Sequence, residues 1–292
     1  MNNIFLLIIS MLACLLGGIL KKYLGGRFVN KEIMYLVYNG TVSLVVAVSL
    51  LIIGGLPKVS YFIVVLGILF GIVTALQHIF NLKALERGLY SYTALIGAFS
   101  TIIPTLSGII LWNEHIAIVQ VIGMSLLTVC IVCSFDFNEE RKNISKQWYL
   151  YVMLTFLCTG SIGVMQKWHQ NTPYREERDT FLIVAFAISF VYSAIRVFVL
   201  KLRQKTDMKQ TIKVDLGLYT VIFLIISGIC VAANNKINLY LSGVMDSAVF
   251  FPVVNGGGLI LTVLASIVIF HEKLNLKKRI GVIAIVLICN PF

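Results

Sequence analysis

Long apolar stretches separated by short clusters of charge are the dominant pattern of this chain. Uncharged runs of at least 20 residues occupy 33–57, 59–82, 88–113, 115–135, 147–166, 216–235 and 247–271. About 20 apolar residues are needed for a helix to cross the hydrocarbon core of a bilayer. Residues 3–20, 180–200 and 280–292 add three less regular spans, the last giving only about 20 Å of helix. The pattern predicts an all-α membrane protein with ten transmembrane helices.

Composition supports the same class of protein. The chain is 59% hydrophobic and only 13% charged, about half the charged fraction of soluble domains. The first span follows Met-Asn-Asn, with no basic segment before it and no small-residue cleavage site after it, so we expect a retained span rather than a signal peptide. All six cysteines lie within predicted spans, which favours packing over disulfide, redox or zinc chemistry.

The net charge of +11 follows the membrane topology. Loops after odd-numbered spans contain 18 Lys and Arg residues, and loops after even-numbered spans contain five: Lys58, Lys167, Arg175, Arg178 and Lys236. Basic residues are enriched in cytoplasmic loops, so the odd-numbered loops are expected in the cytoplasm and both termini outside it. This charge distribution indicates a membrane orientation and gives no reason to expect nucleic acid as a partner.

Two segments half a chain apart are nearly alike. Each runs from a glycine past a proline to an aromatic-x-Glu and then to a second glycine nine residues later; the shared positions are Pro104, Glu114 and Gly123 in one and Pro252, Glu272 and Gly281 in the other. The polar stretch 136–147 reads as a linker, which makes residues 1–135 and 148–292 two repeats. Five spans in each repeat would place the repeats in opposite orientations in the membrane.

A second match supports the duplication. Lys22-Tyr23 ends the first span and Lys167-Trp168 ends the sixth. A long basic side chain beside an aromatic ring is typical of the membrane interface, where the ammonium group reaches water. We therefore expect Lys22 and Lys167 to be structural anchors at that interface.

These motifs resemble the ten-span EamA-type members of the drug/metabolite transporter superfamily. The most specific positions are Ala84–Gly88, Pro104, Glu114, Gly123, Gly243, Pro252, Glu272 and Gly281. The surroundings of Lys22 and of Trp112–Gly123 are also similar to the small multidrug resistance proteins. The resemblance implies a basket of helices around a central cavity and alternating access for small organic solutes. Spans 1, 3, 4, 6, 8 and 9 would line the cavity. Family members commonly place both termini in the cytoplasm, opposite to the charge count, so sidedness stays open.

Amide side chains at membrane depth are the first candidate solute contacts. The third span contains Gln77, His78 and Asn81, and the eighth contains Asn234, Asn235 and Asn238. Gln77 and Asn81 share one helix face, as do Asn234 and Asn238, because residues four apart are neighbours on a helix. Two such faces suit a cavity that hydrogen-bonds a polar solute. The alternative is that the amides join helices to one another.

Ion coupling is the second question. His78 is a candidate proton carrier, although a histidine in an apolar helix is more often a neutral packing residue. All 13 acidic residues lie at span ends or in loops. Where the small multidrug resistance proteins have an essential glutamate, this chain has only Cys14 or apolar neighbours. Antiport through a buried carboxylate is therefore disfavoured, which leaves His78, a less deeply placed acid, or facilitated transport.

The repeated glutamates and prolines have structural and functional interpretations. Glu114 and Glu272 each precede a span, where a carboxylate can accept hydrogen bonds from the first amides of the next helix. Pro104 and Pro252 each remove a helix hydrogen bond, and Asn255 begins an Asn-Gly-Gly-Gly sequence. We favour a broken helix near Pro252 whose carbonyls meet the solute over simple close packing.

These observations favour a secondary transporter, an exporter or facilitator of a small organic metabolite, in the plasma membrane of a bacterium. The alternatives are a flippase for a lipid-linked sugar and a receptor or scaffold that does not transport. An enzyme is not expected, because the sequence lacks a metal-ligand cluster, paired acids, G-x-S-x-G and a P-loop. We expect a small-molecule substrate and the lipid bilayer as partners, no cofactor and no metal, and leave a homodimer open.

Overall fold

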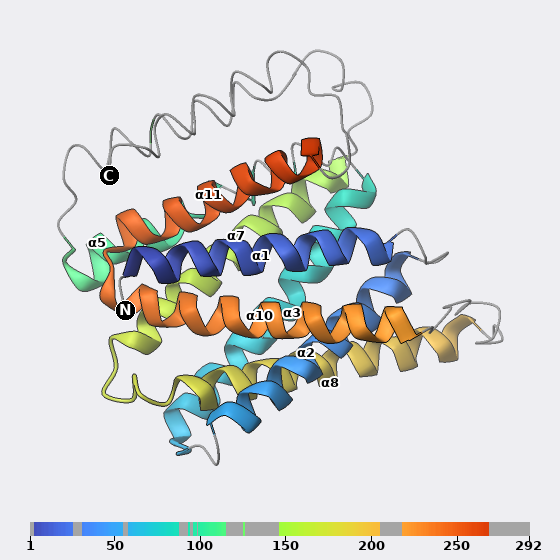
Figure 1. Ribbon diagram of the computed structural model, residues 1–292, viewed down its shortest axis with the longest axis horizontal. Helices are drawn as coiled ribbons and strands as arrows, with labels where there is room; N and C mark the ends of the chain where they lie inside the picture. The colour runs from blue at the N-terminus through green and yellow to red at the C-terminus, as the bar shows by residue number, and fades with distance from the viewer. Residues whose placement is uncertain are drawn as a thin grey trace. The chain divides into compact units, whose positions relative to one another are not determined.

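A computed structural model of the chain describes residues 3–25, 31–54, 58–87, 93, 96–97, 99–114, 125, 146–204 and 218–268. The regular elements in these ranges are helices (Figure 1): α1 (Asn3–Gly25), α2 (Lys31–Gly54), α3 (Tyr61–Arg87), α5 (Ile102–Trp112), α7 (Lys146–Gln170), α8 (Arg178–Gln204), α10 (Leu218–Val244) and α11 (Ser247–Val268). Six of them are long and apolar enough to cross a membrane: α1, α2, α3, α7, α8 and α10. The described part is therefore an all-α structure of the membrane type.

The eight described helices each overlap a different one of the ten predicted spans. Of the fourth span, 88–113, the structure describes a continuous helix only over α5. The spans 115–135, apart from residue 125, and 280–292 lie outside the described residues. The count of ten helices and their arrangement as an inverted repeat therefore stay predictions.

Several helices continue past the charged residues that were expected to end them. The helix α3 runs on to Arg87, α7 passes Lys167, and α10 passes Lys236 to reach Val244. A charged residue marks the end of an apolar run, but it does not interrupt the backbone hydrogen bonds of a helix. Lys and Arg can lie within a membrane helix near its end, because their apolar stems pack along the helix while the charged group reaches water.

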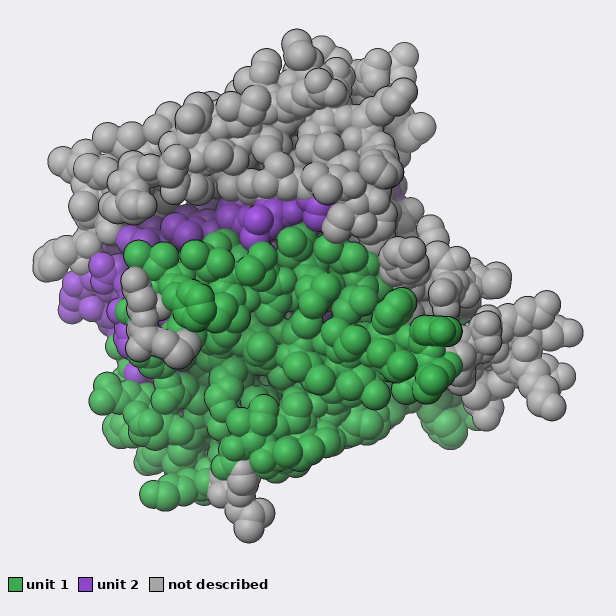
Figure 2. Space-filling model, in the orientation of Figure 1, with its two compact units in different colours: residues 1–75, 171–240 green, residues 76–170, 241–292 purple. Residues whose placement is uncertain are grey.

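The helices form two compact units, coloured separately in Figure 2. Unit 1 consists of residues 1–75 and 171–240, and unit 2 of residues 76–170 and 241–292. Unit 1 contains α1, α2, α8 and most of α10, whereas unit 2 contains α5, α7 and α11. The boundaries fall inside α3 and inside α10. Because each unit is assembled from separate segments, the proposed duplication of 1–135 and 148–292 concerns the sequence and is not tested by this division.

Small and hydroxylated residues allow α2 and α8 to pack closely in unit 1. The amide of Asn39 donates to the hydroxyls of Ser189 and Ser193, at 3.2 and 3.0 Å, and Ser43 donates to Ser189 at 3.2 Å. A Cβ atom on Gly40 would lie 3.3 Å from Ser193 Cβ. Lipid supplies no hydrophobic drive for helix association, so small residues and hydrogen bonds of this kind are what hold such helices together.

Unit 2 packs α5 against α7 around Pro104. This proline is buried at the third residue of α5, where its missing N–H costs little because the first amides of a helix have no partner within it. The chain before it is irregular: Ile103 N donates to Ser100 O three residues back, at 3.1 Å. Gly163 of α7 faces Pro104 so closely that a Cβ atom would lie 2.9 Å from the ring. Pro104 therefore lies in the first turn of α5, where the proline does not interrupt a hydrogen bond within the helix.

The expected break at Pro252 is not found. The helix α11 is continuous from Ser247 to Val268 with Pro252 inside it, and Pro252 itself is buried. A proline early in a helix removes one hydrogen bond, and the neighbouring turns can hold the helical path. The prediction of a broken helix at this point was wrong, and close packing is the better interpretation of Pro252.

Candidate functional site

The strongest candidate site in unit 2 begins with the way α5 ends. Asn113 adopts the left-handed conformation, with φ 51° and ψ 36°, and Glu114 N donates to Gly108 O at 3.2 Å. Many helices end at a residue in this left-handed conformation, which asparagine and glycine adopt most readily. The local sequence therefore sets where the Glu114 side chain leaves the backbone.

Glu114 meets the start of another helix. Its Oε2 accepts a hydrogen bond of 2.9 Å from the backbone N–H of Ser247, the first residue of α11. Gly108 makes this approach possible, since a Cβ atom there would lie 2.8 Å from Ser247 Cβ. Glu114 therefore contacts the first residue of α11, which is not the helix that the sequence predicted it to cap. The helix expected directly after Glu114 lies outside the described residues.

Lys167 completes a charged pair with Glu114. Its Nζ forms an ion pair with Glu114 Oε1 and donates a 3.1 Å hydrogen bond to Met245 O, just after the end of α10. The residue is only 5% exposed. The cation therefore lies at a helix C-terminus and the carboxylate at a helix N-terminus, the arrangement that helix dipoles favour.

This burial corrects the expectation for Lys167. The sequence suggested an anchor whose ammonium reaches water, but the ammonium is buried in the ion pair instead. The neighbouring Trp168 is 47% exposed, and its place at the membrane interface stays a prediction. The partner of Lys167 could not be identified from sequence, because the contact joins α7 to residues beyond the ends of α5 and α10. A basic residue directly after a predicted span has the same local pattern whether it faces water or an acid.

Electrostatics favour an ionised Glu114. Burial alone raises the pKa of its carboxyl group. Hydrogen bonds from Lys167 and from the backbone and side chain of Ser247, together with the Lys167 charge, outweigh burial and hold the pKa below its ordinary value of 4.5. At neutral pH the site therefore contains a carboxylate and an ammonium group in contact.

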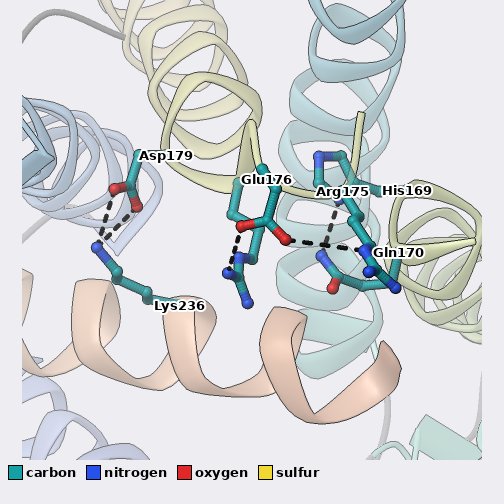
Figure 3. A network of polar contacts seen from close by, with 7 residues as sticks. His169, Gln170, Arg175, Glu176, Asp179 and Lys236 are labelled. Atoms are coloured by element: carbon teal, nitrogen blue, oxygen red, sulfur yellow. Dashed lines mark hydrogen bonds and ion pairs between the residues drawn. The ribbon is translucent and has the colours of Figure 1, made fainter. Parts of the chain in front are cut away.

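A buried histidine, His169, lies two residues after Lys167 in α7. It was not among the residues predicted from the sequence. His169 is fully buried, and Gln170 Nε2 lies 2.9 Å from its Nδ1 in a hydrogen bond (Figure 3). Gly243 lets the chain approach Gln170, since a Cβ atom there would lie 2.8 Å from Gln170 Oε1. Nothing in the local sequence separates His169 from an exposed loop residue, because it stands at the end of the span.

The amides of α10 join this helix to α1 within unit 1. Asn234 Nδ2 donates to Ser10 O and to Ser10 Oγ, at 2.9 and 3.0 Å, and Ser10 Oγ donates to Asn238 Oδ1 at 2.5 Å. Asn238 Nδ2 also donates to Asn234 Oδ1 at 3.3 Å, and Asn235 donates to Val231 O of its own helix. This geometry favours the helix-joining interpretation for Asn234 and Asn238. Ser10, which is completely buried, was not singled out from the sequence.

The other predicted positions are more scattered. In unit 2, Gln77 and Asn81 are half-buried and His78 is exposed on α3, while Asn255 is exposed on α11. The meeting of the α3 and α10 amide faces around one solute stays a prediction. Gly123, Glu272 and Gly281, and the side chain of Lys22, lie outside what the structure describes.

A second charged pair in unit 1 provides a useful contrast. Lys236 Nζ lies 2.8 and 3.0 Å from the two carboxylate oxygens of Asp179 (Figure 3). The side chains are 40% and 26% exposed, far more than those of Lys167 and Glu114. An exposed pair of this kind contributes little to stability, so the buried pair in unit 2 is the more informative site. In the ranges described, no three His, Cys, Asp or Glu residues are grouped to hold a metal ion.

Comparisons with known proteins add the fold but no activity. No protein-family model matches the chain. An uncharacterized protein, the MG316 homolog of Mycoplasma pneumoniae (strain ATCC 29342 / M129 / Subtype 1), is 31% identical over 103 residues, which cover 32% of this chain and 28% of that protein. The match thus spans less than a third of that relative. One crystal structure of a protein is similar over 98% of this chain and 94% of its own, with a TM-score of 0.73 and 13% identity. At that identity the likeness shows a shared fold alone.

Proposed function

We propose that this chain is a secondary transporter of a small polar organic metabolite, an EamA-type member of the drug/metabolite transporter superfamily. In this proposal ten helices form two inverted five-helix repeats in the plasma membrane of a bacterium. Six apolar membrane-type helices and the paired Pro, Glu and Gly segments of the sequence support it. The nearly complete overlap with a solved fold is compatible with it.

The observation on which the proposal rests is the buried pair of Glu114 and Lys167. Ionisable groups buried among membrane helices are costly and typically belong to solute or ion pathways. This pair links residues just after α5 and α10, the last turn of α7 and the first residue of α11. A contact that joins four helix ends can act as a gate in transport, because the ends can separate only when the ion pair breaks.

The energetics of breaking the pair suggest how a solute drives the change. A buried charge that loses its partner costs about 3–5 kcal/mol. A polar solute or a proton that satisfies Glu114 or Lys167 lowers this cost and allows the helix ends to separate. In this proposal Glu114 is the less deeply placed acid that couples transport, while Gln77, His78 and Asn81 of α3 contribute to the solute path.

The experiment starts with ligand identification. The purified chain is screened by thermal stability against amino acids, nucleosides, sugars and organic acids, and stabilising solutes are tested as radiolabelled substrates in proteoliposomes. We expect Lys167→Gln to lower uptake at least about tenfold, since it leaves Glu114 buried alone. Lys236→Gln removes an equal charge from the exposed pair and should stay within about twofold. His78→Ala and Asn81→Ala test the solute path in the same assay.

Two results would contradict the proposal. Uptake by Lys167→Gln at the wild-type rate would show that the pair has no part in transport. Full uptake by Glu114→Gln/Lys167→Gln, with loss only in the single variants, would reduce the pair to a stabilising contact. Stabilisation by a polyprenyl-linked sugar, and by none of the soluble solutes, would support a flippase instead.

A further inference from the structure

Two cations share one aromatic ring where α3 ends and α7 begins, in unit 2. Lys83 Nζ lies 5.3 Å and Arg87 Cζ 4.9 Å from the ring centroid of Tyr151. Arg87 Nε also donates to Gln147 Oε1 at 3.2 Å, and Arg87 Nη1 donates to Lys83 O at 3.3 Å. The ring and these hydrogen bonds therefore hold two like charges close together, although like charges repel each other.

The packing beneath this cluster fixes its geometry. Ala84, Trp148 and Val152 are almost fully buried against one another, with Tyr151 packed beside them. Trp148 Nε1 donates to Thr93 Oγ1 at 3.1 Å, and Phe80 stacks on Tyr151 with ring centroids 6.4 Å apart. A rigid platform keeps both cations in place before any ligand arrives, which lowers the entropic cost of binding.

The ends of the apolar spans lead us to expect this cluster near the lipid headgroups. The apolar span of α3 ends at Asn81, two residues before Lys83, and α7 begins with Lys146. Over residues 83–87 and 146–151 the sequence has Lys83, Arg87 and Lys146 against a single acid, Glu86. Arginine matches the oxygens of a phosphate with paired N–H groups, and lysine adds a compact positive charge.

An exposed apolar face of α7, which begins next to Tyr151 in the sequence, is suited to acyl chains. Leu150, Met153 and Leu157 are all exposed, and their spacing of three and four residues places them on one side of the helix. A headgroup phosphate at Lys83 and Arg87 can therefore continue into hydrocarbon along α7. This continuity favours a lipid over a soluble anion.

We propose that Lys83, Arg87 and Tyr151 form a binding site for the headgroup phosphate of an anionic phospholipid. The site is separate from Glu114 and Lys167 and does not depend on the proposed transport. Basic pockets between membrane helices commonly bind such headgroups, and each Lys or Arg near an anionic surface strengthens binding about fivefold. Loss of both cations is thus expected to weaken binding about thirtyfold.

The test measures lipid binding to the purified full chain by native mass spectrometry. Phosphatidylglycerol is titrated against phosphatidylcholine, which has the same phosphate but no net charge. We expect the wild-type chain to prefer phosphatidylglycerol and Lys83→Gln/Arg87→Gln to lose that preference. Lys83→Arg/Arg87→Lys keeps both charges and should bind within about threefold of wild type.

A matched control removes two charges at other positions. Lys58 lies just before α3, and Arg178 lies 5.2 Å from the Tyr240 ring, so it also contacts an aromatic side chain. Lys58→Gln/Arg178→Gln should retain the lipid preference. The proposal is overturned if this control loses binding equally, if both lipids bind alike, or if inorganic phosphate displaces phosphatidylglycerol at equal concentration.

Discussion

At the residue scale, the meaning of a charge in this chain depends on its partner. Lys167 and Lys236 are single lysines beside apolar runs, and both pair with a carboxylate. Yet Lys167 is buried between the ends of other helices, whereas Lys236 is partly exposed. The cost of separating each pair differs accordingly, because water can replace a lost partner only where it reaches the charge.

This difference predicts a pH dependence for Glu114. Since its pKa is held below 4.5, the ionised carboxylate stabilises the folded chain above that pH, and the contribution is lost as the pH falls through the lowered pKa. Glu114→Gln should therefore unfold at a lower temperature than wild type at pH 7, with a deficit of about 3 kcal/mol. The deficit should shrink on acidification to about pH 3, because protonated Glu114 then resembles glutamine.

Thermal unfolding in detergent between about pH 7 and pH 3 measures this effect. Glu176→Gln is the control, because Glu176 is 76% exposed and its ion pairs in the described part of the chain are with Arg175 and Arg178 (Figure 3). It should lie near wild type at every pH. A deficit for Glu114→Gln that stays constant across the range would show that ionisation of Glu114 does not stabilise the fold.

At the element scale, close contact between helix backbones organises unit 1. Gly67 and Gly71 lie one turn apart on α3 and face α8, where a Cβ atom on Gly67 would meet Phe181 O at 3.0 Å. Phe70 and Phe181 pack edge to face beside them, with ring centroids 4.9 Å apart. Small residues spaced by four are a common device for such approaches in membranes.

The contact of α3 with α8 predicts that Gly71→Ala is destabilising. The added Cβ atom would lie 2.9 Å from Ile188 Cβ and 3.2 Å from Ala185 C, so the helices must separate, at a cost of about 1–3 kcal/mol. Gly18→Ala is the matched control, because nothing lies within 4 Å of a Cβ atom there. It should be neutral or stabilising by up to about 1 kcal/mol, since alanine favours helix more than glycine. Thermal unfolding of both variants measures these effects. An equal loss of stability in the two variants would contradict the close contact of α3 with α8 at Gly71.

At the scale of the whole molecule, hydrogen bonds join two connections between helices in unit 1. Ser60 N donates to Glu177 Oε2 at 2.9 Å, and Thr180 Oγ1 donates to Lys58 O at 2.6 Å. The connection between α2 and α3 and the one between α7 and α8 therefore share a side of the membrane. The charge count of the sequence predicts that this side lies outside the cytoplasm.

Cysteine labelling tests this topology in a variant without native cysteines. Val59→Cys and Arg175→Cys, both at exposed positions, should react with a membrane-impermeant maleimide added to spheroplasts. Leu202→Cys, exposed near the far end of α8, should react only after permeabilisation. Labelling of positions 59 and 175 from opposite sides would contradict the hydrogen-bonded loops. A complete reversal would contradict the orientation from charge and agree with the one common in the resembled family.

Prediction from sequence succeeded where the signal is local. The apolar runs located the helices. Pro252 misled, because neighbouring turns preserve α11 across it. His169 and Ser10 went unnoticed, since a buried polar residue and an exposed one have the same letter in a sequence, and only the neighbours from other helices distinguish them.

The sequence by itself determined that this is a chain of membrane helices and approximately where they lie. The bilayer acts on each segment separately, so every backbone polar group must be satisfied within its own helix. Only the tertiary structure decided that Lys167 is buried against Glu114, that Ser10 binds Asn234 and Asn238, and that two cations meet on Tyr151. These contacts join residues far apart in the chain, and their energies depend on distance and burial, which no local pattern contains.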